Sequence, residues 1–263
     1  MSSRWIVRPS PAPHASVRLF TLPYAGGSAF VYQAWPKGLA PAVELNAIQL
    51  PGRGGRLNEP PFKRMEPMVR AIAAEVLPHL DRPFSIFGHS MGAVVGFELA
   101  RLLRREYNLE PLHLFVSGCS APQYPAGRAP FHRLPREELL RELRRLGGTS
   151  QKVMHEEELL EMLLPALRAD FEVLETYSYE AEPPLGCPIS AFGGLEDDYA
   201  GRESLEAWRA QTSSRFSLRM FNGDHFFLQS SSEGSLLAAI SRDLYPHYSG
   251  EGQLTSPSRL GAD

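Results

Sequence analysis

A serine within the pattern Gly-x-Ser-x-Gly is the first feature of this sequence that could do covalent chemistry. The pattern occupies residues 88–92, between an apolar run at 84–89 and a following segment whose apolar residues recur at helical spacing. Alone the pattern arises often by chance, but a strand before it and a helix after it are typical of a nucleophile elbow. Ser90 is therefore the candidate nucleophile. The backbone N–H of Met91, at the positive end of the helix, is expected to face the oxyanion that forms on attack.

An acid and a base that could serve this serine lie further along the chain, each just after a predicted strand. Ser90, Asp197 and His225 occur in the order nucleophile, acid, base, which is the order of α/β hydrolases. In such a triad the histidine takes the serine proton, and the aspartate holds the imidazole in the required tautomer. Neighbouring residues leave alternatives open: Glu196 or Asp198 as the acid, Asp224 as a less natural acid beside the base, and His89 as a structural neighbour of the nucleophile.

A second oxyanion donor is expected from an early loop. The apolar run 18–24 predicts a strand that leads directly into Ala25, Gly26, Gly27 and Ser28. In α/β hydrolases a backbone N–H after an early strand completes the oxyanion hole, so the N–H of Ala25 is the expected donor. A Gly-Gly pair suits an ordinary turn equally well.

The elements that must hold these residues alternate along the chain. Strands are predicted at 18–24, 44–50, 84–89, 113–118, 187–194 and, from an alternating pattern, 216–221, and helices at 66–80, 91–103, 205–210 and 233–244. Strands separated by helices favour a parallel sheet, and the triad order makes the expected class an α/β-hydrolase fold with helices flanking a mostly parallel sheet. Loop 51–56 is expected to be irregular. Its Arg53 and Arg56 are expected to be solvated or paired at the surface, with a phosphate contact as the alternative.

The alternation stops between residues 121 and 182. Helical patterns at 136–146, 156–164 and 166–177 follow one another there without a strand. We expect a helical lid over the carboxyl ends of the strands, where it would shape an acyl pocket and exclude water; a helical decoration without a gating role is the alternative. The expected division is a loose leader at 1–16, a hydrolase core at 17–120 and 183–246, the lid at 121–182, and a disordered tail at 247–263. Gly147 and Gly148 offer a hinge or a helix cap.

Composition narrows the classes of function. The chain has 263 residues and a formal net charge of -3, which gives no basic surface for nucleic acid. Without an apolar run of membrane-spanning length or a secretory signal, a cytoplasmic enzyme is expected. Cys119 and Cys187, the only cysteines, are interpreted as small buried hydrophobes. Neither a His-Glu-x-x-His pattern nor a phosphate-binding glycine loop occurs, so no metal or cofactor is expected.

Motifs spread along the chain resemble the type II thioesterases that accompany polyketide synthases and nonribosomal peptide synthetases. Several of them lie outside the triad, in the lid and after the second strand, so the resemblance is more specific than the hydrolase fold, and it runs from about Arg18 to Leu244. The motifs are 23–28 (Pro-Tyr-Ala-Gly-Gly-Ser), 50–53 (Leu-Pro-Gly-Arg), 88–93 (Gly-His-Ser-Met-Gly-Ala), 145–149 (Arg-Leu-Gly-Gly-Thr), 167–171 (Leu-Arg-Ala-Asp-Phe), 192–194 (Phe-Gly-Gly) and 225–228 (His-Phe-Phe-Leu).

The resemblance implies hydrolysis of thioesters on the phosphopantetheine arm of acyl or peptidyl carrier proteins, which would clear aberrant or stalled acyl groups. It places the nucleophile on Ser90, the acid on Asp197 and the base on His225, with oxyanion donors at the backbones of Ala25 and Met91. Two places depart from the family pattern: Gly54 and Gly55 where an acidic residue is usual, and Asp224 where glycine commonly precedes the base. The second departure could perturb the base, because a nearby carboxylate favours imidazolium.

Other functions remain open at this stage. A carboxylesterase or acyltransferase could use the same triad, and a carrier-protein binder without activity could keep the fold, although the intact triad argues against it. We expect a monomer whose partners are carrier proteins. As a hypothesis, four lid arginines meet an acidic carrier helix, whereas the glutamates among them favour an ordinary solvated face: Arg136, Arg141, Arg144 and Arg145, with Glu137, Glu138 and Glu142.

Overall fold

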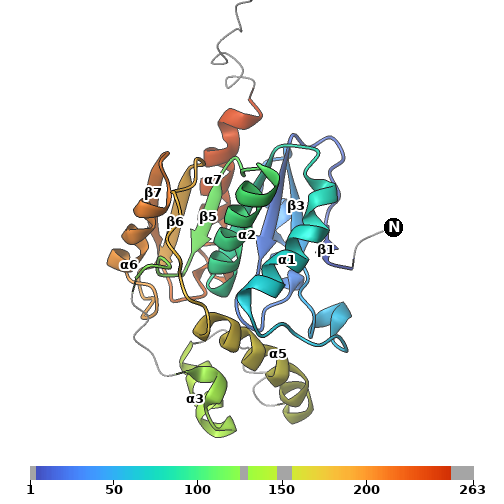
Figure 1. Ribbon diagram of the computed structural model, residues 1–263, viewed down its shortest axis with the longest axis vertical. Coiled ribbons are helices and arrows are strands. Elements are labelled where there is room, and N and C mark those ends of the chain that lie inside the picture. Colours follow the sequence, from blue (N-terminus) through green and yellow to red (C-terminus); the bar gives the residue numbers. More distant parts are fainter. Residues whose placement is uncertain (1–3, 125–129, 147–155, 250–263) are drawn as a thin grey trace, which may run out of the picture.

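A single seven-stranded sheet organises the chain, of which the computed structural model describes residues 4–124, 130–146 and 156–249. Its strand order is β1-β3-β2-β4-β5-β6-β7, and every neighbouring pair is parallel except β1 with β3 (Figure 1). The strands are β1 (Ile6–Val7), β2 (Val17–Leu22), β3 (Val43–Ile48), β4 (Phe84–His89), β5 (Leu114–Ser117), β6 (Ile189–Gly194) and β7 (Phe216–Phe221). The predicted mostly parallel α/β fold is confirmed.

Helices cover both faces of the sheet. In Figure 1, α1 (Met65–Val76) and α2 (Met91–Tyr107) lie in front of the sheet and α7 (Glu233–Leu244) lies behind it. Because successive side chains of a strand point to opposite faces, Ile86 joins the apolar cluster beneath α1 and α2, while its neighbour Phe87 joins the cluster beneath α7. Burial on both faces explains why a central strand such as β5 is almost wholly apolar in sequence, whereas the edge strand β7 is only half-buried and alternates between apolar and polar residues.

Shorter elements complete the core. The helix α6 (Arg202–Glu206) follows β6 and contributes Leu205 to the cluster that contains Ile86. Short 3-10 turns lie at Ala29–Tyr32, Trp35–Lys37, Gly54–Arg56, Leu77–His79, Phe131–Arg133, Ala207–Gln211, Phe227–Gln229 and Tyr245–His247. The predicted helices 66–80 and 205–210 are therefore each an α-helix that ends in a 3-10 turn, and loop 51–56 contains one such turn.

The two ends of the chain are more ordered than the sequence predicted. Ile6, in the expected loose leader, is buried and pairs with Ile48 of β3; a two-residue strand whose partner lies far along the chain leaves no local signal. At the other end, Tyr248 donates from its hydroxyl to the carbonyl of Ser241 at 2.8 Å. Both expectations were wrong for these residues, while 250–263 lie outside the described residues.

The predicted insertion between β5 and β6 is helical and forms its own apolar cluster. In Figure 1, α3 (Arg136–Leu146) and α5 (Glu157–Glu175) lie together beyond one end of the sheet. The buried residues of this cluster are Leu139, Leu140, Leu143, Leu160, Leu164, Leu167 and Phe171. Gly147 and Gly148, the predicted hinge or cap, lie outside the described residues.

The single helix α5 takes the place of the two helices that the sequence predicted at 156–164 and 166–177. Pro165 lies inside α5, although proline removes a backbone hydrogen bond and usually ends or kinks a helix. Leu164 and Leu167, on either side of it, belong to the same apolar cluster. Packing against α3 therefore continues across the proline, and tertiary contacts outweigh the local preference.

Candidate active site

The turn between β4 and α2 has the geometry of a nucleophile elbow. Ser90 has φ 53° and ψ −116°, a conformation that residues with a Cβ rarely adopt, and its N–H donates to Ser117 O at 2.7 Å. A Cβ on Gly88 would lie 1.9 Å from the carbonyl oxygen of Gly92, and a Cβ on Gly92 would lie 2.2 Å from the carbonyl oxygen of Leu22. Glycine is thus required at both positions by backbone contacts.

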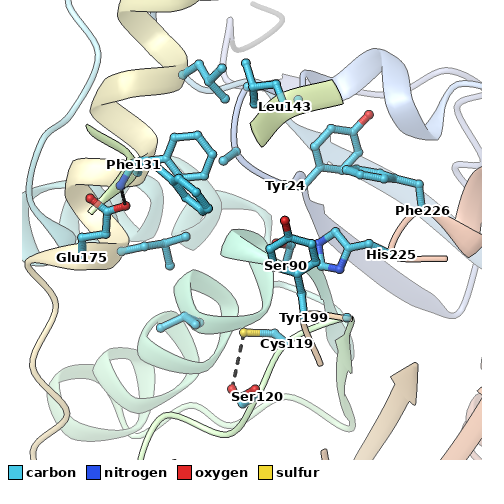
Figure 2. Close-up of a pocket in the computed structure, with 18 of the residues that line it drawn as sticks. Tyr24, Ser90, Cys119, Ser120, Phe131, Leu143, Glu175, Tyr199, His225 and Phe226 are labelled. Atoms are coloured by element: carbon cyan, nitrogen blue, oxygen red, sulfur yellow. Dashed lines mark hydrogen bonds between the residues drawn. The ribbon is translucent and has the colours of Figure 1, made fainter. Parts of the chain in front are cut away.

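Asp197 and His225 form a buried hydrogen-bonded pair. The two atoms Asp197 Oδ2 and His225 Nδ1 are 2.9 Å apart. Because an ionised carboxylate only accepts, the ring carries its proton on Nδ1, and Nε2 is left as the basic nitrogen. The other oxygen, Oδ1, accepts from the backbone N–H groups of Tyr199 at 2.7 Å and Ala200 at 3.2 Å. Figure 2 shows Ser90 beside the His225 ring, so the three predicted residues come together.

The rival acids lie elsewhere. Glu196, Asp198 and Asp224 are all exposed, whereas Asp197 is buried. The Asp224 carboxylate accepts from the N–H of Phe226 at 2.8 Å and so closes its own turn. Asp197 is therefore the acid that the structure joins to the base, through its hydrogen bond to His225.

His89 is buried next to the candidate base His225. Its Nδ1 lies 2.9 Å from Ser117 Oγ, and its ring centroid lies 5.1 Å from that of His225. Burial lowers the pKa of His89 well below its ordinary value, and the nearby His225 lowers it further. A Cβ on Gly118 would approach the His89 ring to 2.6 Å. This tight packing supports the structural role predicted for His89.

The loop after β2 is fixed by two hydrogen bonds. Gly27 N–H donates to Tyr24 O at 2.9 Å, and Gly26 N–H donates to Asp170 Oδ2 at 2.7 Å. Ala25, between these anchors, lines the same cavity as Ser90. The N–H groups of Ala25 and Met91 remain our predicted oxyanion donors, since Ala25 lines the same cavity as Ser90 and Met91 follows Ser90 directly in the chain.

Sequence reasoning missed an ion pair between this region and the lid. Arg53, predicted at the surface, has only 1% of its surface exposed and forms two hydrogen bonds with the carboxylate of Asp170, which is fully buried. Arg56 is also buried; it lies over the ring of Trp5 and bonds to Glu59. The arginines are paired, as one alternative held, but they are not at the surface. The only sequence signal was that Arg53 belongs to the motif 50–53 and Asp170 to the motif 167–171.

A cavity of about 1420 Å³ extends from Ser90 and His225 to the lid helices. Ser90 and His225 lie on one side of it, and Cys119 and Tyr177 also line it. The lid contributes mostly apolar side chains: Phe131, Leu143, Leu160, Leu163, Leu164, Leu167, Phe171 and Leu174. Such an apolar surface suits an acyl chain.

Two of the four lid arginines are engaged within the protein. Arg136 pairs with Glu157 and with Glu161, and Arg145 bonds to Glu142 at 3.2 Å and to Tyr199 Oη at 2.9 Å. These pairs support an ordinary charged helix face for these two arginines. The hypothesis of an arginine patch for carrier proteins therefore loses two of its members.

Comparison with known proteins identifies the family. The sequence model of the family described as Thioesterase domain matches residues 17–244. The chain belongs to this family. Linear gramicidin dehydrogenase LgrE of Brevibacillus parabrevis is 46% identical over 94% of this chain and 95% of its own length. Thioesterase PikA5 of Streptomyces venezuelae is 40% identical over 86% of this chain and 81% of its own length.

A solved structure supports the same assignment. The type II thioesterase BorB from the borrelidin biosynthetic cluster has a TM-score of 0.85 to this chain at 37% identity, and the match covers 93% of this chain and 99% of that one. Although the name of LgrE includes a dehydrogenase, the family and the other two names give a thioesterase. The predicted resemblance to type II thioesterases is confirmed, and the chain is a hydrolase of the thioesterase family. Within the described residues, no helix is long and apolar enough to cross a membrane, and no cluster of three His, Cys, Asp or Glu side chains is arranged to hold a metal.

Proposed function

We propose that this thioesterase releases acyl groups from the phosphopantetheine arm of acyl or peptidyl carrier proteins of a polyketide or nonribosomal peptide synthase. The observation that carries the proposal is the position of Ser90 and the Asp197–His225 pair in a large cavity that an apolar lid covers. The relatives PikA5 and BorB, whose names give a thioesterase and a biosynthetic cluster, support it.

The reaction follows from the positions of the three side chains. His225 Nε2 takes the proton of Ser90 Oγ as the oxygen attacks the thioester carbonyl, and Asp197 stabilises the imidazolium that forms. Collapse of the tetrahedral intermediate breaks the C–S bond, and the thiol of the arm leaves with a proton from His225. Water, deprotonated by His225, then attacks the acyl-serine and releases the free acid.

The oxyanion hole and substrate positioning supply most of the rate enhancement, because a thiolate is already a good leaving group. The backbone N–H groups of Ala25 and Met91 donate to the oxyanion in both halves of the reaction. Since Ser90, His225 and Asp197 supply nucleophile, base and acid from one chain, we propose that the enzyme acts as a monomer and needs neither a metal nor a bound cofactor. We further propose that it acts in the cytoplasm.

The first experiment measures release of free acid from an acyl-phosphopantetheinyl carrier protein. Wild type is compared with Ser90→Ala, with Ser120→Ala as a matched serine variant that also lines the cavity, and with a small ester as the second substrate. We expect wild type and Ser120→Ala to clear the carrier and prefer it over the ester, and Ser90→Ala to be inactive.

Each other outcome has a distinct meaning. Cleavage of the ester alone would replace the proposed substrate by that of a carboxylesterase. Acyl transfer to an added alcohol in place of water would favour an acyltransferase. If a serine-reactive fluorophosphonate failed to label Ser90, only a carrier-protein binder without activity would remain.

A further inference from the structure

A buried carboxylate of the lid reaches into the loop that holds the predicted oxyanion donor. Asp170 lies on α5 with no exposed surface. Its Oδ2 accepts from Gly26 N–H at 2.7 Å and from Arg53 Nη1 at 2.5 Å, and its Oδ1 accepts from Arg53 Nη2 at 2.8 Å. The sheet core and the lid helix are thus joined at the residue next to Ala25.

These bonds determine the direction of the Ala25 N–H. This N–H belongs to the same trans peptide group as the carbonyl of Tyr24, so the two point in opposite directions. Gly27 N–H holds the Tyr24 carbonyl at 2.9 Å. Asp170 holds the next peptide group through Gly26 N–H. With its own peptide plane and the next one both held, the Ala25 N–H cannot rotate without breaking one of these two hydrogen bonds.

Arg53 makes the position of this carboxylate compatible with catalysis. An unpaired anion near the oxyanion loop would oppose the negative charge that develops on the substrate oxygen. The two hydrogen bonds from Arg53 offset the charge of Asp170, and Arg53 Nη1 also donates to the carbonyl of Gly27 at 3.3 Å. The guanidinium therefore keeps that carbonyl engaged in the loop.

The loop after β2, which contains Gly26, and the loop after β3, which contains Gly52, both lie directly against α5. Gly26 has φ +77°, and a Cβ there would lie 2.9 Å from Leu167 Cδ1; a Cβ on Gly52, at φ +80°, would lie 3.2 Å from Ala166 Cβ. Leu167 is three residues before Asp170 and lies on the same side of the helix. The helix therefore contacts the oxyanion loop through packing as well as through charge.

We propose that Asp170 is a positioning residue that couples the seating of the lid helix α5 to the formation of the oxyanion hole. The inference rests on the proposed function only in that Ala25 is the donor. When α5 is seated, the carboxylate orients the loop; when α5 moves away, Gly26 N–H and Arg53 lose their acceptor and the donor loses its fixed direction. Thioester attack is thereby confined to the covered state of the cavity, from which water is excluded.

The test separates positioning from stability. Asp170→Asn removes the charge, and the double variant Asp170→Leu with Arg53→Met replaces the ion pair by apolar groups, which a buried site often tolerates. Glu172→Gln is the matched control: it lies on the same helix, and its ion pair with Arg64 also ties α5 to the core. We measure kcat, KM, melting temperature, and the affinity of a trifluoromethyl ketone, whose hemiketal oxygen occupies the oxyanion hole.

We expect both Asp170 variants to lose about 100-fold in kcat and a similar factor in ketone affinity, while KM changes less than about threefold. Glu172→Gln should leave kcat, KM and ketone affinity unchanged. A folded double variant with normal kcat would overturn the proposal, as would a loss of kcat without a loss of ketone affinity. If Asp170→Asn does not fold, the double variant decides. Failure of wild type to cleave carrier thioesters would refute the proposed substrate alone, because ketone affinity still reports on the oxyanion hole.

Discussion

Replacing Asp197 by asparagine tests the catalytic assignment through the hydrogen bonds around a single carboxylate. Oδ1 accepts two backbone N–H groups, from Tyr199 and Ala200, and Oδ2 accepts from His225 Nδ1. The amide oxygen of an asparagine must therefore take the place of Oδ1. Its NH₂ then faces His225 Nδ1, which has to accept, so the ring proton moves to Nε2. In that tautomer the histidine cannot take the proton of Ser90.

The size of the effect follows from the alternative orientation of the amide. Turning its oxygen towards His225 would restore the active tautomer but leave two buried N–H groups facing an NH₂ donor. Each unsatisfied group costs about 1–3 kcal/mol, so about 2–6 kcal/mol opposes the productive orientation, or roughly 30-fold to 10⁴-fold in its population. The imidazolium also loses its anionic partner. We therefore expect kcat for Asp197→Asn to fall about 10⁴-fold, as in other triads with this change.

The assay is release of free acid at saturating acyl-carrier substrate, with circular dichroism to confirm folding. KM is expected to change less than about threefold, because the carboxylate points at the base and not at the substrate. Asp198→Asn, at the exposed neighbouring position, is the control and should keep wild-type kcat. A folded Asp197→Asn enzyme that keeps more than about a tenth of wild-type kcat would refute the reasoning, and so would a large loss in the control.

Two further predictions concern buried titratable groups. Burial raises the pKa of the Cys119 thiol to about 12, so roughly 10⁻⁴ of the thiol is ionised at pH 8. Iodoacetamide should therefore leave the activity intact although Cys119 lines the cavity. Inactivation together with an adduct on Cys119 would contradict this prediction. Burial lowers the pKa of His113 to about 4, whereas the ordinary value is near 6.5. Between these two pH values the unfolded chain binds more protons than the folded protein. The free energy of unfolding therefore falls as the pH decreases through this window, by about 2 kcal/mol at pH 5. Urea unfolding at pH 7.5 and 5 should show this loss for wild type and a smaller loss for His113→Gln, whereas equal losses would refute it.

The candidate catalytic residues could be picked out in the sequence because each has a local signal. Gly88 and Gly92 are required by backbone contacts within the turn itself, so they remain in the sequence beside Ser90. Asp197 and His225 each follow an apolar strand, and parallel strands deliver their ends to one edge of a sheet. The chain order of the triad does not separate Asp197 from its neighbours Glu196 and Asp198; the family resemblance favoured Asp197, and the hydrogen bond to His225 agrees with that choice.

What the sequence could not show depends on contacts between distant segments. The two residues Arg53 and Asp170 are separated by strands β4 and β5 and most of the lid. An arginine in a Gly-rich loop therefore looks solvated until its partner is known. Pro165 predicts a break in α5, yet packing of Leu164 and Leu167 against α3 carries the helix through it. In each case a local preference is outweighed by burial against an element far away in the chain.

The helix α5 combines two tasks that are often assigned to separate parts of a hydrolase. Leu160 and Leu164 help to form the apolar wall of the cavity, while Asp170, further along the same helix, is bonded to the loop beside Ala25. A single rigid element therefore cannot cover the acyl chain without also seating the carboxylate. Because the Asp170–Arg53 pair is buried, separating it exposes an expensive unpaired charge, so intermediate positions of the helix are disfavoured. The desolvation cost of a buried ion pair means that the pair adds little net stability. The cost of separating the two charges nevertheless favours two states of the helix, and we propose that the serine is active only in the fully seated one.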